Sequence, residues 1–585
     1  MVSRSAFNRL SVTIKGGQGG ALEVAWSRVN VIRVAFLVLY CVVGLRLFDL
    51  MVLQEFKIGE NPFSHTPAPE LSHAEDKIEV RRADIVDRNG VLLATSLKTA
   101  SLYADPKHIM SPEIAAKALV EIFPDLTYGT TLKKLRRSGR FVWIKRGIVP
   151  EDQMKVMKIG EPGFGFRDEY KRFYPQGSMA AHLVGYGNTD GTGLMGIERA
   201  LQGTLVAHDE DHNVVKTTLD VRFQHALRSE IMLAKDKFEA RGASGIIMNA
   251  KSGDVLAMVS LPDFDPHAPM AAPKKTQFNS ATLGVYELGS VFKIFSTAAL
   301  LESNKDALSM TFDAREPLKR YGHTINDFHA EKRIMSVPEV FMVSSNIGTA
   351  LMGEMVGTEA MKAFYKKLGL MDKPDVVFSE VGSPLYPRPW REINTLTASY
   401  GHGIAVSPLQ LATAVSMIVN GGYKITPRFV LPDTPSQGGG ADDDASSHIQ
   451  TRIVSEDTSK IMRSLMRLVV TDGTASKAAV EGFDVGGKTG TAEKPGKKGY
   501  DRKRLLSSFV GAFPIDDPEY VVFVALDEPK GLKETYGYAT AGWTAAPVFS
   551  NVIKRMVSIE AKSTGFADIK KQIQPVSNAS YKGGN

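Results

Sequence analysis

The chain has 585 residues, of which 43% are hydrophobic and 23% are charged, and its formal net charge is +7. This balance excludes a disordered or collagen-like chain, and the length exceeds what one ordinary hydrophobic core accommodates, so two or more folded units are expected. The positive charge is modest for the length, and no pattern of basic and aromatic residues indicates nucleic-acid binding. The single cysteine, Cys41, excludes an intrachain disulfide.

An apolar stretch near the amino terminus, residues 31–53, is interrupted only by Arg33, Arg46 and Asp49. As a helix it would be about 34 Å long, which is enough to cross the hydrocarbon core of a bilayer. Basic residues dominate the preceding segment, and by the positive-inside rule they keep the amino terminus in the cytoplasm. A cleaved signal peptide is the alternative, but no small-x-small cleavage site follows the apolar run. We therefore predict a cytoplasmic segment at 1–30, an uncleaved single-span anchor at 31–53 and export of the remainder.

Residues 54–215 are predicted to form an α+β domain that we call the pedestal. A linker with three prolines, residues 61–69, opens it. Short strand-like runs at 101–103 and 141–144 then alternate with helical patterns and many glycines.

Residues 216–560 are predicted to form a second α+β domain. Its strands are expected in a hairpin at 244–259 and in three runs near the end, at 483–492, 507–513 and 520–526. A long helical middle separates these strands, and a helical stretch at 545–558 follows them. Strands at both ends indicate a sheet closed by amino- and carboxy-terminal pieces. A flexible excursion is predicted at 432–447 and a disordered tail at 561–585.

Three patterns suggest functions that their surroundings do not support. Residues 191–196 match G-x-G-x-x-G, but turn-like residues rather than a buried strand precede them, so a tight structural turn is predicted. The twelve histidines form no H-E-x-x-H pair and no Cys/His set, so no metal site is expected. The basic run at 494–504 lies between two predicted strands and indicates a solvated hairpin tip.

The tetrapeptide Ser290-Val291-Phe292-Lys293 is the single S-x-x-K of the chain and is predicted to open a helix. Its spacing places the hydroxyl and the amine on one helical face. A serine hydroxyl needs a base to become a nucleophile, and a desolvated lysine can supply that base. The helix amino terminus suits a developing oxyanion. Alone, however, this tetrapeptide is common and carries little weight.

Two further motifs give it weight. Ser344-Ser345-Asn346 stands 54 residues downstream of Ser290, and Lys488-Thr489-Gly490-Thr491 follows 144 residues later in a strand-like segment. In this order the three motifs resemble those that penicillin-binding proteins and serine β-lactamases bring around one cleft.

The surrounding sequence resembles class B high-molecular-mass penicillin-binding proteins. Residues 286–290 resemble Y-E-P-G-S, with Leu288 in place of proline. Residues 84–90 resemble the R-G-x-I-x-D-R-N-G block of the amino-terminal module, with Ala83 in place of glycine, and residues 193–198 fit the same module. The S-S-N motif and residues 527–538 are closer to the division-specific, FtsI-type branch. The resemblance implies a penicillin-binding, serine β-lactamase-like transpeptidase domain with an antiparallel sheet, preceded by an anchor and an elongated pedestal.

The resemblance also implies a role for each motif residue in a D-Ala-D-Ala transpeptidase. Ser290 attacks the penultimate D-alanine of a stem peptide, Lys293 is the base, Ser344 passes the proton to the leaving amine and Lys488 supplies positive charge. Asn346 holds the substrate amide, Thr489 and Thr491 bind the terminal carboxylate, and Gly490 between them belongs to the same substrate-binding segment. The backbone N–H groups of Ser290 and Thr491 form the oxyanion hole.

The implied partners are stem peptides, nascent glycan strands, a polytopic glycosyltransferase of the FtsW type and other division proteins, with β-lactams as inhibitors. No metal or organic cofactor is implied, and the expected location is the bacterial inner membrane with a periplasmic catalytic domain. The alternatives are an elongation-specific transpeptidase, a D,D-carboxypeptidase and a β-lactam sensor. A serine β-lactamase would have about half this length, and an idle scaffold would have no need of three intact motifs.

Overall fold

The computed structural model describes residue 30 and residues 33–44, 81–206, 214–432, 451–496 and 499–564. The chain divides into two compact units, residues 1–77 and 78–585. The described residues of the first unit are helical, and no described helix of the chain is both long and apolar enough to cross a bilayer. Several predictions fall on residues outside those described: both ends of the anchor, the linker at 61–69, nearly all of the excursion at 432–447 and most of the tail.

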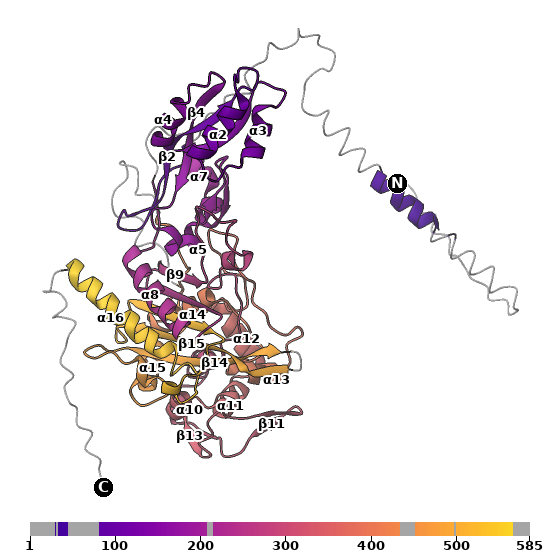
Figure 1. Cartoon of the computed structure of the whole chain (residues 1–585). Coiled ribbons are helices and arrows are strands. Elements are labelled where there is room, and N and C mark those ends of the chain that lie inside the picture. Colours follow the sequence, from indigo (N-terminus) through magenta and orange to yellow (C-terminus); the bar gives the residue numbers. More distant parts are fainter. Residues whose placement is uncertain are drawn as a thin grey trace, which may run out of the picture. The chain divides into compact units, whose positions relative to one another are not determined.

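The second unit begins with a five-stranded sheet in which β2 pairs with β1, β3 and β4 (Figure 1). The strand-like runs predicted at 101–103 and 141–144 fall on β2 and β3. Three helices, α2 to α4, pack around an apolar cluster that includes Leu102, Leu119 and Leu135. The elements are β1 (Ile85–Val86), β2 (Leu92–Ala104), α2 (Pro112–Ile122), α3 (Tyr128–Leu135), β3 (Val142–Ile148), α4 (Pro150–Met157), β4 (Phe164–Phe173) and β7 (Val215–Lys216).

Short elements follow β4 and surround the sequence that matched G-x-G-x-x-G. They are η3 (Gly177–Ala180), α5 (Ala181–Val184), β5 (Tyr186–Gly187), β6 (Gly193–Met195), α6 (Gly196–Ala200) and α7 (Gln202–Val206). A Cβ at Gly193 would lie 1.9 Å from the Glu198 carbonyl oxygen, so the backbone there tolerates no side chain. This glycine therefore serves close packing, which supports the predicted structural turn.

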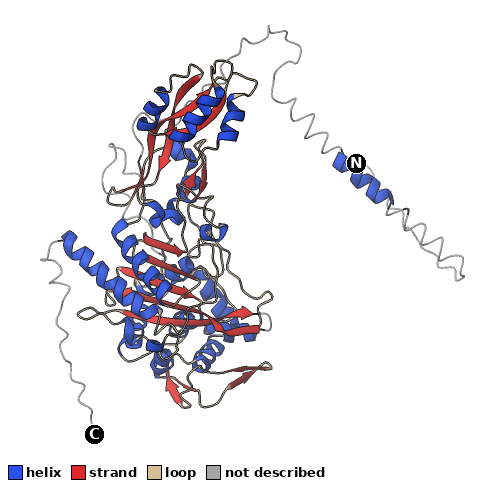
Figure 2. Ribbon diagram, viewed as in Figure 1, coloured by secondary structure: helices blue, strands red, loops and turns tan. Residues whose placement is uncertain are grey.

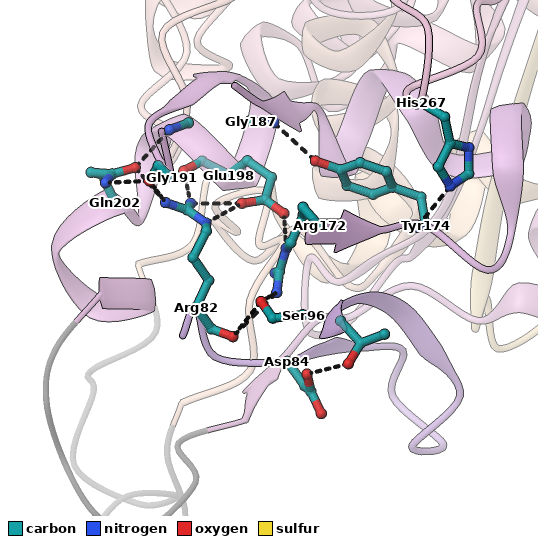
Figure 3. Close-up of polar contacts among 12 residues, drawn as sticks. Arg82, Asp84, Ser96, Arg172, Tyr174, Gly187, Gly191, Glu198, Gln202 and His267 are labelled. Atoms are coloured by element: carbon teal, nitrogen blue, oxygen red, sulfur yellow. Dashed lines mark hydrogen bonds and ion pairs between the residues drawn. The ribbon is translucent and has the colours of Figure 1, made fainter. Parts of the chain in front are cut away.

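A buried charge cluster, formed by Arg82, Arg172 and Glu198, holds these short elements against the sheet (Figure 3). Arg82 donates from Nε and Nη2 to Glu198 Oε2 at 2.9 and 2.6 Å, and Arg172 Nε donates to Oε1 at 2.6 Å. Arg82 Nη1 also donates to the Gly191 carbonyl at 2.5 Å and to Gln202 Oε1 at 2.8 Å. The backbone of the turn at 191–196 thus accepts a hydrogen bond from Arg82.

A second five-stranded sheet, antiparallel throughout, has the order β14-β15-β16-β8-β9. Figure 2 shows strands in red with helices in blue around them. The predicted hairpin at 244–259 and the three predicted carboxy-terminal runs form this sheet, so those predictions are confirmed. Its strands are β8 (Gly242–Asn249), β9 (Val255–Leu261), β14 (Gly486–Gly496), β15 (Gly499–Phe513) and β16 (Tyr520–Asp527). The basic run at 494–504 belongs to the β14–β15 hairpin, but Lys494 and Arg504 pair with Glu528 at 2.8 and 2.9 Å, so its base is ion-paired rather than simply solvated.

Helices cover both faces of this sheet because alternate residues of a strand point to opposite sides. On one side Gly245 of β8 lies against Leu227 and Ile231 of α8 (Val221–Lys237), which packs with α16 (Ala545–Thr564). On the other side Met248 of β8 contacts Thr413 of α14 (Pro408–Val419), which packs with α15 (Glu456–Thr471).

The predicted tail starts too early, since residues 561–564 still belong to α16. The preceding turns of this helix are anchored by three buried side chains, those of Val552, Ile553 and Met556. The helix then continues through Glu560 and Ala561, which are both good helix formers.

The predicted helical middle lies between the strands of this sheet in sequence and carries two small two-stranded antiparallel sheets, β10–β13 and the hairpin β11–β12. Its elements are η4 (Lys274–Gln277), η5 (Gly289–Phe292), α9 (Lys293–Ser303), η6 (Ala307–Ser309), β10 (Thr311–Asp313), β11 (Leu318–Arg320), β12 (His323–Ile325), β13 (Ile334–Ser336), α10 (Val337–Val343), α11 (Asn346–Val356), α12 (Thr358–Lys367) and α13 (Glu392–Ser399). Two further 3-10 turns, η7 (Ser476–Ala478) and η8 (Lys533–Thr535), lie near the end of the chain.

Candidate active site

Ser290 lies in the 3-10 turn η5, and Lys293 is the first residue of the buried helix α9. The sequence predicted that the tetrapeptide opens the α-helix, whereas the structure inserts one tighter turn first. Leu288, which stands where the related motif has proline, is buried in the core just before this turn. Among the described residues, the Ser290 hydroxyl has no hydrogen-bond partner, and the residue lines a cleft.

The S-S-N motif is the junction of two helices. Ser344 ends α10 in the left-handed conformation, with φ at 66°, and Ser345 caps α11 by accepting a hydrogen bond from Gly348 N at 2.9 Å. The side-chain cap fits the known preference for serine at this position. Asn346 is the first residue of α11. The motif therefore projects three polar side chains from a short, sharply turned segment.

Asp327, which the sequence reasoning missed, fixes this junction. Its carboxylate accepts hydrogen bonds from Ser345 Oγ at 2.8 Å, from Asn346 N at 2.5 Å and from Ile347 N at 2.9 Å. A carboxylate at a helix amino terminus satisfies free N–H groups and complements the helix dipole. Because Asp327 lies 18 residues before Ser345 in the chain, no local motif pointed to it.

The Ser344 hydroxyl lies between two lysines. Lys293 Nζ donates to Ser344 Oγ at 3.1 Å, and Lys488 Nζ donates to the same oxygen at 2.9 Å. Lys293 Nζ also donates to the Ser344 carbonyl at 2.5 Å and to Asn346 Oδ1 at 2.8 Å. One chain of hydrogen bonds thus links all three motifs.

Both lysines are fully buried, and neither forms an ion pair with a described carboxylate. Burial lowers the pKa of the Lys293 ammonium well below its usual range, the charge of Lys488 lowers it further, and Asp327 acts in the opposite direction. Burial also lowers the pKa of Lys488, to about 7. An amine with a lowered pKa can accept a proton at neutral pH, as a general base requires.

The K-T-G-T segment lies on β14, directly beside the turn that carries Ser290. A Cβ at Gly490 would lie 2.4 Å from the Leu288 carbonyl oxygen, so this strand meets the turn backbone to backbone. Thr491 Oγ1 accepts from Ala541 N at 3.1 Å, and the hydroxyls of Thr489 and Thr474 lie 2.8 Å apart. The segment is thereby held in place at the wall of the cleft.

The cleft has a volume of about 500 Å³. Five of the predicted site residues line it, namely Ser290, Ser344, Asn346, Thr489 and Thr491, and Lys293 and Lys488 lie buried behind them. The structure therefore brings together residues from three distant stretches of sequence. Its rim is aromatic, with Phe328, Tyr400, Tyr500 and Trp543. Glu287, whose carboxylate also lines the cleft, is a further residue that the sequence reasoning gave no role.

Comparisons with known proteins agree with this geometry. The chain matches the penicillin binding protein transpeptidase domain over residues 243–554 and the penicillin-binding protein dimerisation domain over residues 77–220. It is 37% identical to the probable peptidoglycan D,D-transpeptidase FtsI of Caulobacter vibrioides, over 82% of this chain and 81% of that protein. It is 26% identical to the peptidoglycan D,D-transpeptidase FtsI of Escherichia coli, over 84% of this chain and 86% of that protein.

A crystal structure of penicillin binding protein 3 from Mycobacterium tuberculosis, in complex with aztreonam, superposes with a TM-score of 0.63. The two sequences are 25% identical, and the superposition covers 82% of this chain and 96% of the mycobacterial chain. The matched domains and the cleft that unites the three motifs lead to one conclusion: the chain belongs to the class B penicillin-binding proteins of the FtsI type.

Proposed function

We propose that the chain is a peptidoglycan D,D-transpeptidase of the division septum, and that it works through an acyl-enzyme on Ser290. The observation that carries this proposal is the Ser344 hydroxyl, which bridges two buried lysines in the cleft that Ser290 also lines. This arrangement supplies a nucleophile, a base and a proton path, which are the groups that acyl transfer needs.

In the first half-reaction Ser290 Oγ attacks the carbonyl carbon of the penultimate D-alanine. Lys293, in its neutral form, accepts the hydroxyl proton as the new C–O bond forms. The peptide C–N bond then breaks, and the leaving amine takes a proton through Ser344 Oγ. The terminal D-alanine departs, and an ester on Ser290 remains.

The cleft wall binds and orients the donor peptide. Thr489 and Thr491 offer hydroxyls to the terminal carboxylate, with the charge of Lys488 behind them, and the Asn346 side chain holds the peptide amide. The N–H groups of Ser290 and Thr491 stabilise the oxyanion, a role that their adjacent backbones support, because Gly289 meets the Thr491 carbonyl so closely that a Cβ would lie 2.8 Å from it.

In the second half-reaction an amine from a neighbouring stem peptide attacks the ester carbonyl. The C–N bond of the cross-link forms, the C–O bond to Ser290 breaks and Ser290 Oγ regains a proton. A D,D-carboxypeptidase would give the same ester to water instead, so the products formed with and without an acceptor amine distinguish the two activities.

Covalent trapping tests the nucleophile. Benzylpenicillin resembles D-Ala-D-Ala and should add its full mass at Ser290, as intact-mass analysis and peptide mapping would reveal. Ser290→Ala should abolish the adduct and retain the unfolding profile of the unchanged protein. An adduct on another serine would contradict the proposal.

We also propose that residues 31–53 form a single span of the inner membrane, with residues 1–30 in the cytoplasm. The apolar composition of this stretch and the basic residues before it support this topology. Alkaline phosphatase fused after residue 60 should be active, and a fusion before Arg28 should be inactive. A mature chain that begins near residue 50 would contradict the anchor.

For the pedestal we propose a docking role towards an FtsW-type glycosyltransferase that supplies nascent glycan strands. The FtsI-type relatives support a role in division. Depletion should then give filamentous cells, whereas rounded cells would indicate the elongation branch. A chimera with an elongation-type anchor and pedestal should still bind penicillin but fail to restore septation, and normal division by that chimera would refute the docking role.

A further inference from the structure

A carboxylate that the acylation chemistry does not use lines the same cleft as Ser290. Glu287 precedes Ser290 by three residues, and its side chain is 19% exposed. Its Oε1 accepts hydrogen bonds from Gly403 N and from the Tyr500 hydroxyl, both at 2.9 Å. Its Oε2 lies 3.6 Å from Nδ1 of His402. One carboxylate oxygen is therefore held by the protein, and the other faces a histidine that is 43% exposed.

The Glu287 carboxylate has one described neighbour that can carry a positive charge, His402. Among the described residues, no lysine or arginine forms an ion pair with it, and His402 carries charge only when protonated. The charge contributes, after burial, to raising the pKa of Tyr400 to about 12, and it acts in the same direction on the pKa of Tyr500. A carboxylate with no lysine or arginine among its described ion-pair partners, in the same cleft as Ser290, can bind a cationic group of the substrate.

Aromatic rings surround this carboxylate. The rings of His402 and Tyr500 lie 4.4 Å apart, and those of His402 and Tyr400 lie 6.2 Å apart. Ring faces attract organic cations, and they exclude water from the charged contact. The chemistry of this corner thus suits an ammonium group on an alkyl chain.

We propose that Glu287, with His402 and Tyr500, forms the subsite for the ammonium group of the acceptor. This inference rests on the proposed transpeptidase function and assigns residues to its second half-reaction. The ammonium donates a hydrogen bond to Glu287 Oε2, and His402 accepts one of its protons at Nε2, because Nδ1–H faces the carboxylate. The freed nitrogen lone pair forms the C–N bond to the ester carbonyl carbon. The C–O bond to Ser290 then breaks and Ser290 Oγ takes the second proton that the nitrogen loses, while His402 releases the first proton to solvent, so that a neutral amide and a free serine result.

The simplest competing explanation is that Glu287 only braces the loop at Gly403 and the hairpin at Tyr500. Glu287→Gln separates the two explanations, since the amide oxygen of glutamine can still accept both of those hydrogen bonds while the negative charge is lost. A brace would survive this substitution, and an ammonium subsite would not.

The measurement is the partition of one acyl-enzyme between two nucleophiles. The full chain reacts with an acyl-D-alanyl thioester donor in the presence of glycinamide and methanol, and the amide and methyl ester products are quantified. Their ratio does not depend on how fast the acyl-enzyme forms. We expect Glu287→Gln to lower the amide-to-ester ratio by about tenfold or more, the scale of a lost hydrogen bond to a charged group.

Glu493 provides a matched control, because it lines the same cleft but lies 3.8 Å from Arg502, a cation of its own. Glu493→Gln should leave the product ratio unchanged. In the unchanged protein, triethylammonium, a cation that cannot form an amide, should suppress the amide product more than the methyl ester, which tests the subsite without any variant.

An unchanged amide-to-ester ratio in Glu287→Gln, or an equal loss of both products, would reduce Glu287 to a brace and overturn the subsite. Equal suppression of both products by triethylammonium would do the same. Failure of the unchanged protein to form any acyl-enzyme is a different result, since it would overturn the proposed function and the subsite with it.

Discussion

Two regions of this chain bury positive charge, and they do so in opposite ways. In the amino-terminal part, Arg82 and Arg172 share the carboxylate of Glu198, and all three side chains are at most 6% exposed (Figure 3). In the cleft, Lys293 and Lys488 are buried with neutral oxygens as their hydrogen-bond partners. The arginines remain charged because each is paired with the carboxylate. The lysines have no described carboxylate as an ion-pair partner, and burial lowers their pKa values.

The residue types fit this division. A guanidinium remains protonated under all ordinary conditions and offers a rigid fork of donors, which suits a permanent structural connection between β4, α6 and the turn at Gly191. A lysine amine gives up its proton when it is desolvated, which suits a base. Buried charge is therefore a structural device in one region and a chemical one in the other.

The largest expected effect comes from removing the shared anion of the paired cluster. Glu198→Gln leaves two buried arginines without their carboxylate and should reduce the free energy of unfolding by about 3–5 kcal/mol, the usual result of breaking a buried ion pair. Urea unfolding monitored by circular dichroism measures this change. The fraction that remains folded should still be acylated by penicillin at the normal rate, and a loss of acylation without a loss of stability would show that the two regions are not separate.

A smaller effect is expected where a lysine of the cleft is given a permanent charge. Lys293→Arg retains the positive charge but holds its proton too tightly to act as a base, so acylation should slow by roughly 100-fold or more. Stopped-flow or gel measurements of the penicillin acylation rate would test this. Near-normal acylation in a folded Lys293→Arg protein would give Lys293 a structural role like that of Arg82.

The third prediction concerns the pH at which acylation begins. Lys488 lowers the pKa of Lys293 and Asp327 raises it. In the proposed mechanism neutral Lys293 is the active form, so the acylation rate should rise as pH increases through this pKa. Lys488→Gln should therefore move the rising limb to higher pH, and Asp327→Asn should move it to lower pH, as pH profiles of the acylation rate would record. If the rising limb moved in the same direction in both variants, the proposed coupling of Lys488 and Asp327 to Lys293 would be wrong.

The smallest effect is expected at an exposed ion pair, which serves as the control for the first prediction. Glu113 and Arg136 pair on the surface, where each side chain is about half exposed. Glu113→Gln should leave the urea midpoint of unfolding nearly unchanged, since solvent screens such pairs. If its effect equalled that of Glu198→Gln, burial would not be what distinguishes the paired cluster.

The sequence predicted the β14-β15-β16-β8-β9 sheet because apolar runs bounded by turns mark parts of its strands, as at Gly245–Met248 and in the runs that became β15 and β16. It also identified the three motifs, because their residue types and order carry the chemistry. These signals are local, and each is visible within a few neighbouring residues.

What the sequence did not predict depends on contacts between distant residues. Asp327 bonds to the S-S-N motif although β13 and α10 separate them in the chain, and the Glu287 carboxylate gains its partners from Gly403 and Tyr500. The buried pairing of Arg82 with Glu198 joins positions 116 residues apart. No spacing rule connects such positions, so only the folded chain reveals them.

The close contact between β14 and the turn that carries Ser290 limits which substitutions near the cleft can confer resistance to β-lactams. Where Gly490 meets the Leu288 carbonyl there is no space for even one methyl group, so selection cannot reshape this wall of the cleft without displacing Ser290. The aromatic rim is free of that constraint, because Phe328, Tyr500 and Trp543 are side chains at the mouth of the cleft. We therefore expect resistant lineages to accumulate substitutions among these aromatic residues and to keep Gly490.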